Sequence, residues 1–135
     1  MKKTWFLAIF IFVALSACQS QSSDKANVAQ AQPASGAYED LDVDAFKAKM
    51  GGTDVVLMDV RTPEEIAKGK IAGALELDYY ASNFQEEITK LDKSKTYLVY
   101  CRSGNRSGKT CKLMAEQGFT KLYNLAGGYN AWPRE

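Results

Sequence analysis

Short apolar runs set between amphipathic segments are the feature that most constrains the fold of this 135-residue chain. Residues 55–58 (VVLM) and 97–100 (YLVY) show no regular alternation of polar and apolar side chains. Such runs are typical of strands that are covered on both faces of a sheet. Because segments with helical spacing follow the runs, the sequence predicts a doubly wound α/β domain in which helices flank a central, mainly parallel sheet.

Helix caps and apolar spacing give the other expected elements. Asp42 is a candidate helix cap, and residues 62–65 (TPEE) are typical of a capping box with proline at the first helical position. The predicted helices cover 43–50, 63–69, 84–91 and the stretch from about 107 to 118. Two further extended segments are expected over 71–77 and 122–125.

Residues 1–17 have the features of a bacterial export signal. Lys2 and Lys3 precede an apolar run over 5–15, which is too short to span a bilayer. The run ends in Leu15-Ser16-Ala17-Cys18, which resembles the lipobox of bacterial lipoproteins. The resemblance implies that a leader of residues 1–17 is removed and that Cys18 is acylated, which would give a stable membrane anchor. An ordinary secretory signal that leaves Cys18 as a free thiol is the alternative.

Residues 18–37 separate this cysteine from the predicted domain, which covers 38–135. They are rich in Gln, Ser and Ala and have almost no large apolar side chain, so we expect a flexible tether. Ser20 is not the aspartate that resembles an inner-membrane retention signal. In a bacterium with two membranes, the periplasmic side of the outer membrane is therefore favoured.

Composition excludes several kinds of chemistry. The sequence contains no histidine, which removes Cys-His and Ser-His nucleophile pairs and imidazole metal sites. The cysteines at 18, 101 and 111 form neither a C-x-x-C motif nor a zinc-ligand cluster. A net charge of +1 gives no field that would attract nucleic acid. We expect no metal, no cofactor and no nucleic-acid partner.

Cys101 is the candidate nucleophile. It directly follows the run 97–100 and precedes a glycine-containing loop and a helix, an arrangement in which backbone amides converge and favour an anion. The same amides lower the pKa of a cysteine and favour its thiolate. Gly104 can adopt the left-handed conformation that such a loop needs. The predicted cradle for an anionic substrate consists of Arg102, Ser103, Gly104, Asn105 and Arg106.

Individual residues of this region have different expected roles. Arg102, beside the nucleophile, is favoured for contact with substrate, whereas Arg106 is favoured for tying the loop together. Ser103, Asn105 and Ser107 have two open roles, a bond to the anion or a cap for the helix. Cys111 lies on the helix stripe that should face the sheet, so core packing is favoured over a resolving thiol.

Three segments resemble the hallmark segments of single-domain rhodaneses, in the family's order: 59–65 (DVRTPEE), 101–107 (CRSGNRS) and 125–132 (LAGGYNAW). The resemblance implies that Cys101 takes sulfane sulfur from thiosulfate or a similar small anion, forms a persulfide and passes the sulfur to a thiol or cyanide acceptor. It also implies supporting positions near the site for Asp59 and Arg61. Where the family often has Gly-His-Ile, this chain has Gly69-Lys70-Ile71, which affects a secondary contact.

Two alternative functions are left open by the sequence. Phosphatases and arsenate reductases of related fold also use a cysteine between a strand and a helix, but the phosphatase loop is one residue longer than the segment between Cys101 and Arg106. The other alternative is a rhodanese-like binding module without turnover. An intact cysteine and loop favour the enzyme.

Overall fold

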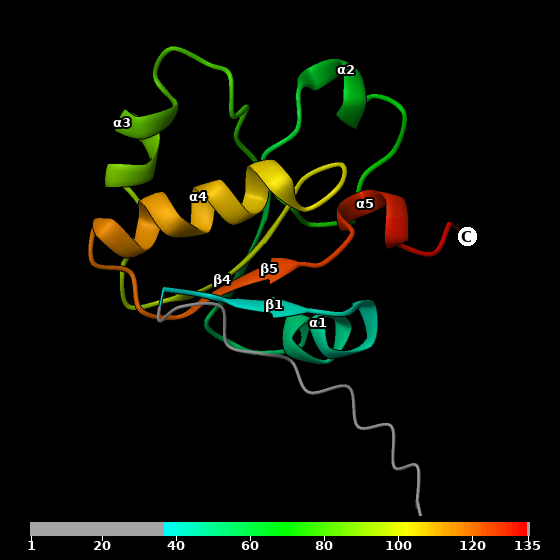
Figure 1. The fold of residues 1–135 in the computed structure, drawn as a ribbon, viewed down its shortest axis with the longest axis horizontal. Helices are drawn as coiled ribbons and strands as arrows, with labels where there is room; N and C mark the ends of the chain where they lie inside the picture. The colour runs from blue at the N-terminus through cyan, green and yellow to red at the C-terminus, as the bar shows by residue number, and fades with distance from the viewer. Residues whose placement is uncertain (1–36, 135) are drawn as a thin grey trace, which may run out of the picture.

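The computed structural model describes residues 37–134, so the predicted signal peptide, the tether up to residue 36 and Cys18 lie outside the described residues. The described part contains a parallel sheet in the order β1-β5-β4-β2-β3 (Figure 1). Its strands are β1 Glu39–Leu41, β2 Val55–Asp59, β3 Leu75–Glu76, β4 Thr96–Tyr100 and β5 Leu122–Leu125. The helices are α1 Val43–Met50, α2 Pro63–Ile66, α3 Phe84–Thr89, α4 Asn105–Glu116 and α5 Gly128–Ala131.

Helices cover both faces of the sheet, which confirms the predicted α/β architecture. In Figure 1, α3 and α4 lie on one side of the strands and α1 lies on the other. Strand β4 serves both layers, because successive side chains of a strand point to opposite faces. Tyr97 and Val99 pack in the cluster beneath α3 and α4, while Leu98 and Tyr100 pack in the cluster beneath α1.

The two helix starts that the sequence predicts are formed by the expected caps. Asp42 accepts a hydrogen bond from the Ala45 amide at 2.9 Å at the start of α1. At α2, Thr62 and Glu65 form the reciprocal capping box, with Pro63 in the first turn. The box fixes the Glu65 side chain over the helix end, and this carboxylate recurs below in the site.

The boundaries differ from the predictions in several places. The predicted extended segment 71–77 is wrong over most of its length, because the chain turns at Gly73 (φ +79°) and only Leu75–Glu76 pairs with β2. Strand β1 was not predicted, since only Leu41 of its three residues is buried and its place depends on pairing with β5. Helices α2 and α3 end before the predicted residues, and α4 begins two residues earlier, at Asn105.

Cys111 lies in the core, as its place on the helix stripe predicts. Its exposed fraction is 0%, and it packs in the cluster between α4 and the sheet together with Met114. Burial raises the pKa of the Cys111 thiol well above its ordinary value. A neutral, buried thiol is a packing group and a poor nucleophile.

Within 37–134 no helix is both long and apolar enough to cross a membrane.

Candidate active site

The three hallmark segments meet at one edge of the sheet. Parallel strands bring their carboxyl ends to the same edge, and β2, β4 and β5 are neighbours in this sheet. Asp59 ends β2, Cys101 follows β4, and the chain after β5 turns at Gly127 into α5. Residues that are distant in sequence therefore surround Cys101, whose exposed fraction is only 1%.

The Cys101 thiol is surrounded by hydrogen-bond donors of its own loop. The Gly104 amide lies 3.2 Å from Sγ and the Ser107 hydroxyl lies 3.4 Å from it. Burial raises the pKa of Cys101, but hydrogen bonds from the Ser107 hydroxyl and from the amides of Ser107, Ser103 and Gly104 outweigh burial. The net result is a pKa below the ordinary value, so thiolate forms more readily without a histidine.

The predicted cradle contributes unequally to this environment. Ser103 and Gly104 supply amides, whereas Arg102 and Asn105 have exposed side chains at the rim. The capping role considered for Ser103, Asn105 and Ser107 is wrong: Gly104 occupies the cap position of α4, and no side chain within 37–134 makes a cap hydrogen bond to this helix. Ser107 instead faces the thiol. The anion-binding role of the loop stays a prediction.

Gly104 gives the loop its shape. Its φ of +93° is in the left-handed region that favours glycine, and the left-handed conformation proposed from the sequence is confirmed. A Cβ at this position would lie 3.1 Å from the Leu125 carbonyl oxygen. Asn124 of β5 donates a hydrogen bond to the Gly104 carbonyl oxygen at 3.2 Å. The turn is therefore fixed by the neighbouring strand as well as by its own backbone.

Helix α5 braces the other side of the loop. The amides of Tyr129 and Asn130 donate to the carbonyl oxygens of Cys101 and Arg102, at 2.8 and 2.9 Å. Gly128 permits this approach, because a Cβ there would lie 2.5 Å from the Cys101 carbonyl oxygen. This contact was not predicted from the sequence. A glycine pair soon after a strand was the available signal for a close backbone approach.

Arg106 and Glu65 join the loop to α2. Both terminal guanidinium nitrogens of Arg106 donate to the Glu65 carboxylate at 2.7 Å, a bidentate pair. Hydrogen bonding from Arg106 lowers the pKa of Glu65 to about 2. The expectation that Arg106 ties the loop together agrees with this geometry. Sequence reasoning assigned Glu65 to the capping box alone and missed its second partner.

Asp59 and Arg61 form a buried ion pair. Arg61 Nε and Nη2 donate to the Asp59 carboxylate at 2.9 and 2.6 Å, and Nη2 also donates to the Gly69 carbonyl oxygen at 2.9 Å. The Arg61 guanidinium lies 4.1 Å from the centre of the Tyr129 ring. The pair thus connects β2 to the segment after α2 and to α5. Neither side chain hydrogen-bonds to Cys101 in the described structure, which fits a supporting position.

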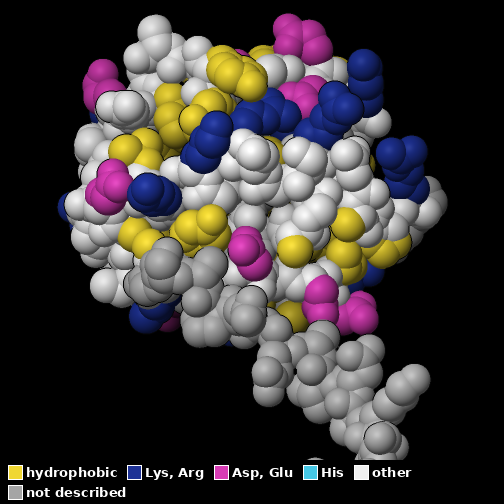
Figure 2. All heavy atoms as spheres, viewed as in Figure 1, with side chains coloured by type: hydrophobic (Ala, Val, Ile, Leu, Met, Phe, Trp, Pro, Cys, Tyr) yellow, Lys and Arg dark blue, Asp and Glu magenta, His cyan; other side chains and the backbone are white. Residues whose placement is uncertain are grey.

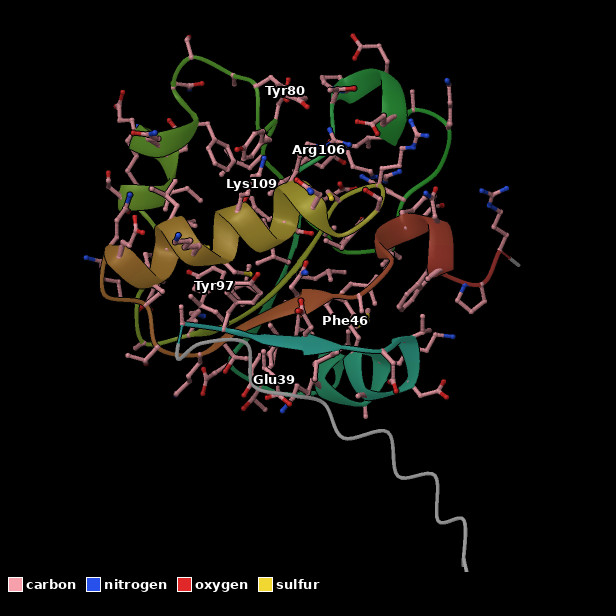
Figure 3. The ribbon with its side chains drawn as sticks, in the orientation of Figure 1. Glu39, Phe46, Tyr80, Tyr97, Arg106 and Lys109 are labelled. Carbon is pink, nitrogen blue, oxygen red and sulfur yellow. The ribbon has the colours of Figure 1, made fainter. Side chains whose placement is uncertain are left out.

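A shallow pocket opens over the loop. Figure 3 shows Arg106 at the start of α4, close to the segment that carries Tyr80. The Tyr80 ring lies 5.5 Å from the Arg106 guanidinium and is 67% exposed. The pocket is lined by Thr62, Glu65, Tyr80, Arg102, Ser103, Arg106 and Asn130. Among residues 37–134 there is no group of side chains suited to hold a metal ion.

Comparison with known proteins agrees with this geometry. Residues 42–135 match the rhodanese-like domain family. The chain is 36% identical over 96 residues to a sulfurtransferase of Allochromatium vinosum, which covers 70% of this chain and 88% of the relative. It is 39% identical over 79 residues to the thiosulfate sulfurtransferase GlpE of Coxiella burnetii, covering 58% and 72% of the two chains. A solved rhodanese-like domain protein of Staphylococcus aureus matches with a TM-score of 0.63 at 29% identity, covering 71% of this chain and 92% of that one.

The chain therefore belongs to the rhodanese-like domain family. The parallel sheet with flanking helices agrees with the solved relatives.

The close approach of α5 predicts a large effect of Gly128→Ala. A Cβ would collide with the Cys101 and Arg102 carbonyl groups, and φ of +58° is unfavourable for alanine. We expect a loss of at least about 2 kcal/mol in the free energy of unfolding, measured by urea titration. Gly51→Ala is the matched control, because Gly51 has φ of −75° and, within 37–134, no residue beyond its chain neighbours has an atom within 4 Å of the position that a Cβ would take there. Equal stability of the two variants would contradict the bracing role of α5.

The Arg106–Glu65 pair predicts a specific pH dependence of stability. Because the folded-state pKa of Glu65 is depressed from 4.5 to about 2, its stabilisation is complete above about pH 4.5 and is lost as the pH falls toward 2. Glu65→Gln keeps a capping amide but removes the charge. We expect the free energy of unfolding of the wild type to be higher than that of this variant by about 1 kcal/mol at neutral pH. Unfolding curves from pH 7 to pH 2 should show the difference shrinking, and a constant difference would contradict the pairing.

Proposed function

We propose that this protein is a sulfurtransferase that takes sulfane sulfur from thiosulfate or a similar donor onto Cys101 and passes it to a thiol or cyanide. Membership of the rhodanese-like family supports sulfurtransferase activity in general. The names of the A. vinosum and C. burnetii relatives, a sulfurtransferase and a thiosulfate sulfurtransferase, support the same class of reaction.

The observation that carries the proposal is the environment of the Cys101 sulfur. Amide and hydroxyl donors lie around it and lower its pKa, although the residue is almost completely buried. A thiolate held in this way attacks the outer sulfur of thiosulfate. The S–S bond of the donor breaks, sulfite leaves with the electron pair, and Cys101 becomes a persulfide.

The second half of the reaction returns the enzyme to its starting state. The acceptor thiolate, or cyanide, attacks the outer sulfur of the persulfide. The bond between the two sulfur atoms breaks, and its electron pair returns to Cys101 as thiolate. The loop amides then stabilise the leaving thiolate as they stabilised the attacking one, so the same donors act in both halves. No external oxidant or reductant enters the balance.

Arg106 favours sulfur transfer over phosphoryl transfer. A phosphoryl group in transfer carries negative charge on three equatorial oxygens and needs donors for all of them. In this protein both terminal nitrogens of Arg106 are engaged by Glu65. Four residues separate Cys101 from Arg106, and the resulting loop suits one added sulfur atom better than a phosphate.

The environment of Cys101 also favours the enzyme over a binding module. A domain that only docks a partner has no need of a cysteine with a lowered pKa next to an open pocket. Here the donors of Ser107 and Gly104 and the pocket over the loop are both present.

We further propose that the domain is exported and held at a bacterial membrane by acylation of Cys18, with the outer membrane's periplasmic side favoured where two membranes exist. Lys2, Lys3 and the apolar run before Leu15-Ser16-Ala17-Cys18 support the proposal. Residues 18–37 would separate the anchor from the domain.

Replacing the nucleophile tests the reaction. We expect Cys101→Ser to keep the fold and lose thiosulfate-to-cyanide sulfur transfer to background, because a hydroxyl cannot form a persulfide. Cys111→Ala is the control and should keep most of the activity, since Cys111 is a core residue.

The wild type should also hydrolyse an aryl phosphate no faster than Cys101→Ser. If the wild type cleaves the phosphate in a Cys101-dependent way and is inactive on thiosulfate, the sulfurtransferase proposal fails and a phosphatase is the better assignment.

Replacing the proposed lipidation site tests the anchor. We expect full-length Cys18→Ser, expressed in a bacterial host, to move from the membrane fraction to the soluble fraction while its transfer activity is retained. The measurement is fractionation of cell envelopes together with the intact mass of wild type, which should show acyl groups. If the variant associates with the membrane as much as the wild type does, the interpretation of residues 15–18 as a lipobox is wrong.

A further inference from the structure

A second and larger groove adjoins the pocket over the loop. It has a volume of about 1020 Å³ and runs between the end of α1, the segment after α2 and the C-terminal residues beyond α5. Glu65, Arg102 and Asn130 line both spaces, so the groove and the pocket are continuous at the rim of the active site. Sites for drug-sized ligands usually have about 300–1,000 Å³. Thiosulfate or cyanide, with a few atoms each, would leave this groove empty.

Positive charge is concentrated along the groove. Lys47, Lys68, Arg102 and Arg134 line it, and none of the four forms an ion pair with another residue in 37–134. The carboxylate in the lining is Glu65, which Arg106 already neutralises. Figure 2 shows Lys and Arg side chains gathered on the part of the surface where α2 and α5 lie. A chain with a net charge of only +1 therefore presents a local surplus of cations beside Cys101.

The four cations come from separate segments, which indicates an extended ligand. Lys47 is on α1, Lys68 follows α2, Arg102 is in the catalytic loop and Arg134 follows α5. A compact anion is bound by donors that converge on one point, whereas charges spread along a groove suit several separate carboxylates. Trp132 and Tyr129 add aromatic surface to the same lining, and the Lys47 ammonium lies 4.9 Å from the Trp132 ring centre.

We propose that this groove binds an acidic, extended segment of an acceptor protein, whose cysteine receives the sulfur from Cys101. The inference rests on the proposed sulfurtransferase activity. Asp and Glu side chains of the segment pair with Lys47, Lys68 and Arg134, and its cysteine enters the pocket past Arg102. The cysteine thiolate attacks the outer sulfur of the Cys101 persulfide, the S–S bond breaks, and Cys101 leaves as thiolate. The acceptor keeps the sulfur as its own persulfide.

The test uses three acceptors and one step of the reaction. Full-length protein is loaded with thiosulfate and separated from excess donor. It is then mixed with one of three acceptors. These are an acidic peptide that contains one cysteine, a basic peptide of equal length that also contains one cysteine, and mercaptosuccinate, a small dicarboxylate thiol. Transfer is followed by the mass of the persulfide formed on the acceptor. We expect the wild type to transfer to the acidic peptide about tenfold faster than to the basic peptide at low ionic strength, with the preference falling as salt is added.

Charge reversal in the groove should remove this preference. Lys68→Glu/Arg134→Glu should reduce the ratio of the acidic-peptide rate to the basic-peptide rate about tenfold. The matched control is Lys93→Glu/Lys112→Glu, which reverses two lysines that do not line the groove. Equal loss in the control, an unchanged ratio in the groove variant, or a mercaptosuccinate rate equal to that of the acidic peptide would overturn the inference.

Binding without chemistry separates this inference from the proposed function. A labelled acidic peptide with Ser in place of Cys should bind the unloaded wild type more tightly than it binds the groove variant, as measured by fluorescence anisotropy. If this binding is present but thiosulfate does not load Cys101, the sulfurtransferase proposal fails and the groove remains. If thiosulfate loads Cys101 but binding does not differ between wild type and groove variant, the groove inference fails alone.

Discussion

The orientation of a few backbone amides around Cys101 is the constraint on which the site depends. The chain has no histidine that could act as a base beside the Cys101 thiol. The pKa of this thiol is instead lowered by the amides of Ser103, Gly104 and Ser107 and by the Ser107 hydroxyl. The left-handed turn at Gly104 is what allows these donors to converge on the Cys101 Sγ atom. Burial opposes the thiolate at the same time, so the lowered pKa depends on these hydrogen bonds being kept.

The surrounding structure can be understood as support for this loop from three directions. Asn124 holds the Gly104 carbonyl oxygen from β5, the α5 amides hold the carbonyl oxygens of Cys101 and Arg102, and Glu65 holds Arg106 from α2. Each support comes from a segment distant in sequence. The parallel sheet is what makes them meet, because it places the ends of β2, β4 and β5 at one edge.

Local patterns were sufficient to predict the elements that carry the chemistry. The buried strands, both helix caps, the place of Cys101 at a strand end and the left-handed Gly104 all follow from short-range rules. Contacts between segments could not be predicted in this way. The second partner of Glu65 and the passage of α5 across the loop depend on tertiary placement. Strand β1 was missed for the same reason, since an edge strand with one buried residue has almost no local signal.

If Cys101 carries sulfur as proposed, its burial restricts where selectivity between acceptors can reside. With 1% exposure, the persulfide would present to an incoming molecule little more than its outer sulfur. The loop donors would act on the charge of that sulfur and contribute little to recognising the body of a donor or an acceptor. Recognition would be left to side chains at the rim, such as Arg102 and Tyr80, and beyond them in the groove. One buried thiolate can therefore serve different sulfur carriers through changes of charge and shape outside the loop, at little cost to the chemistry inside it.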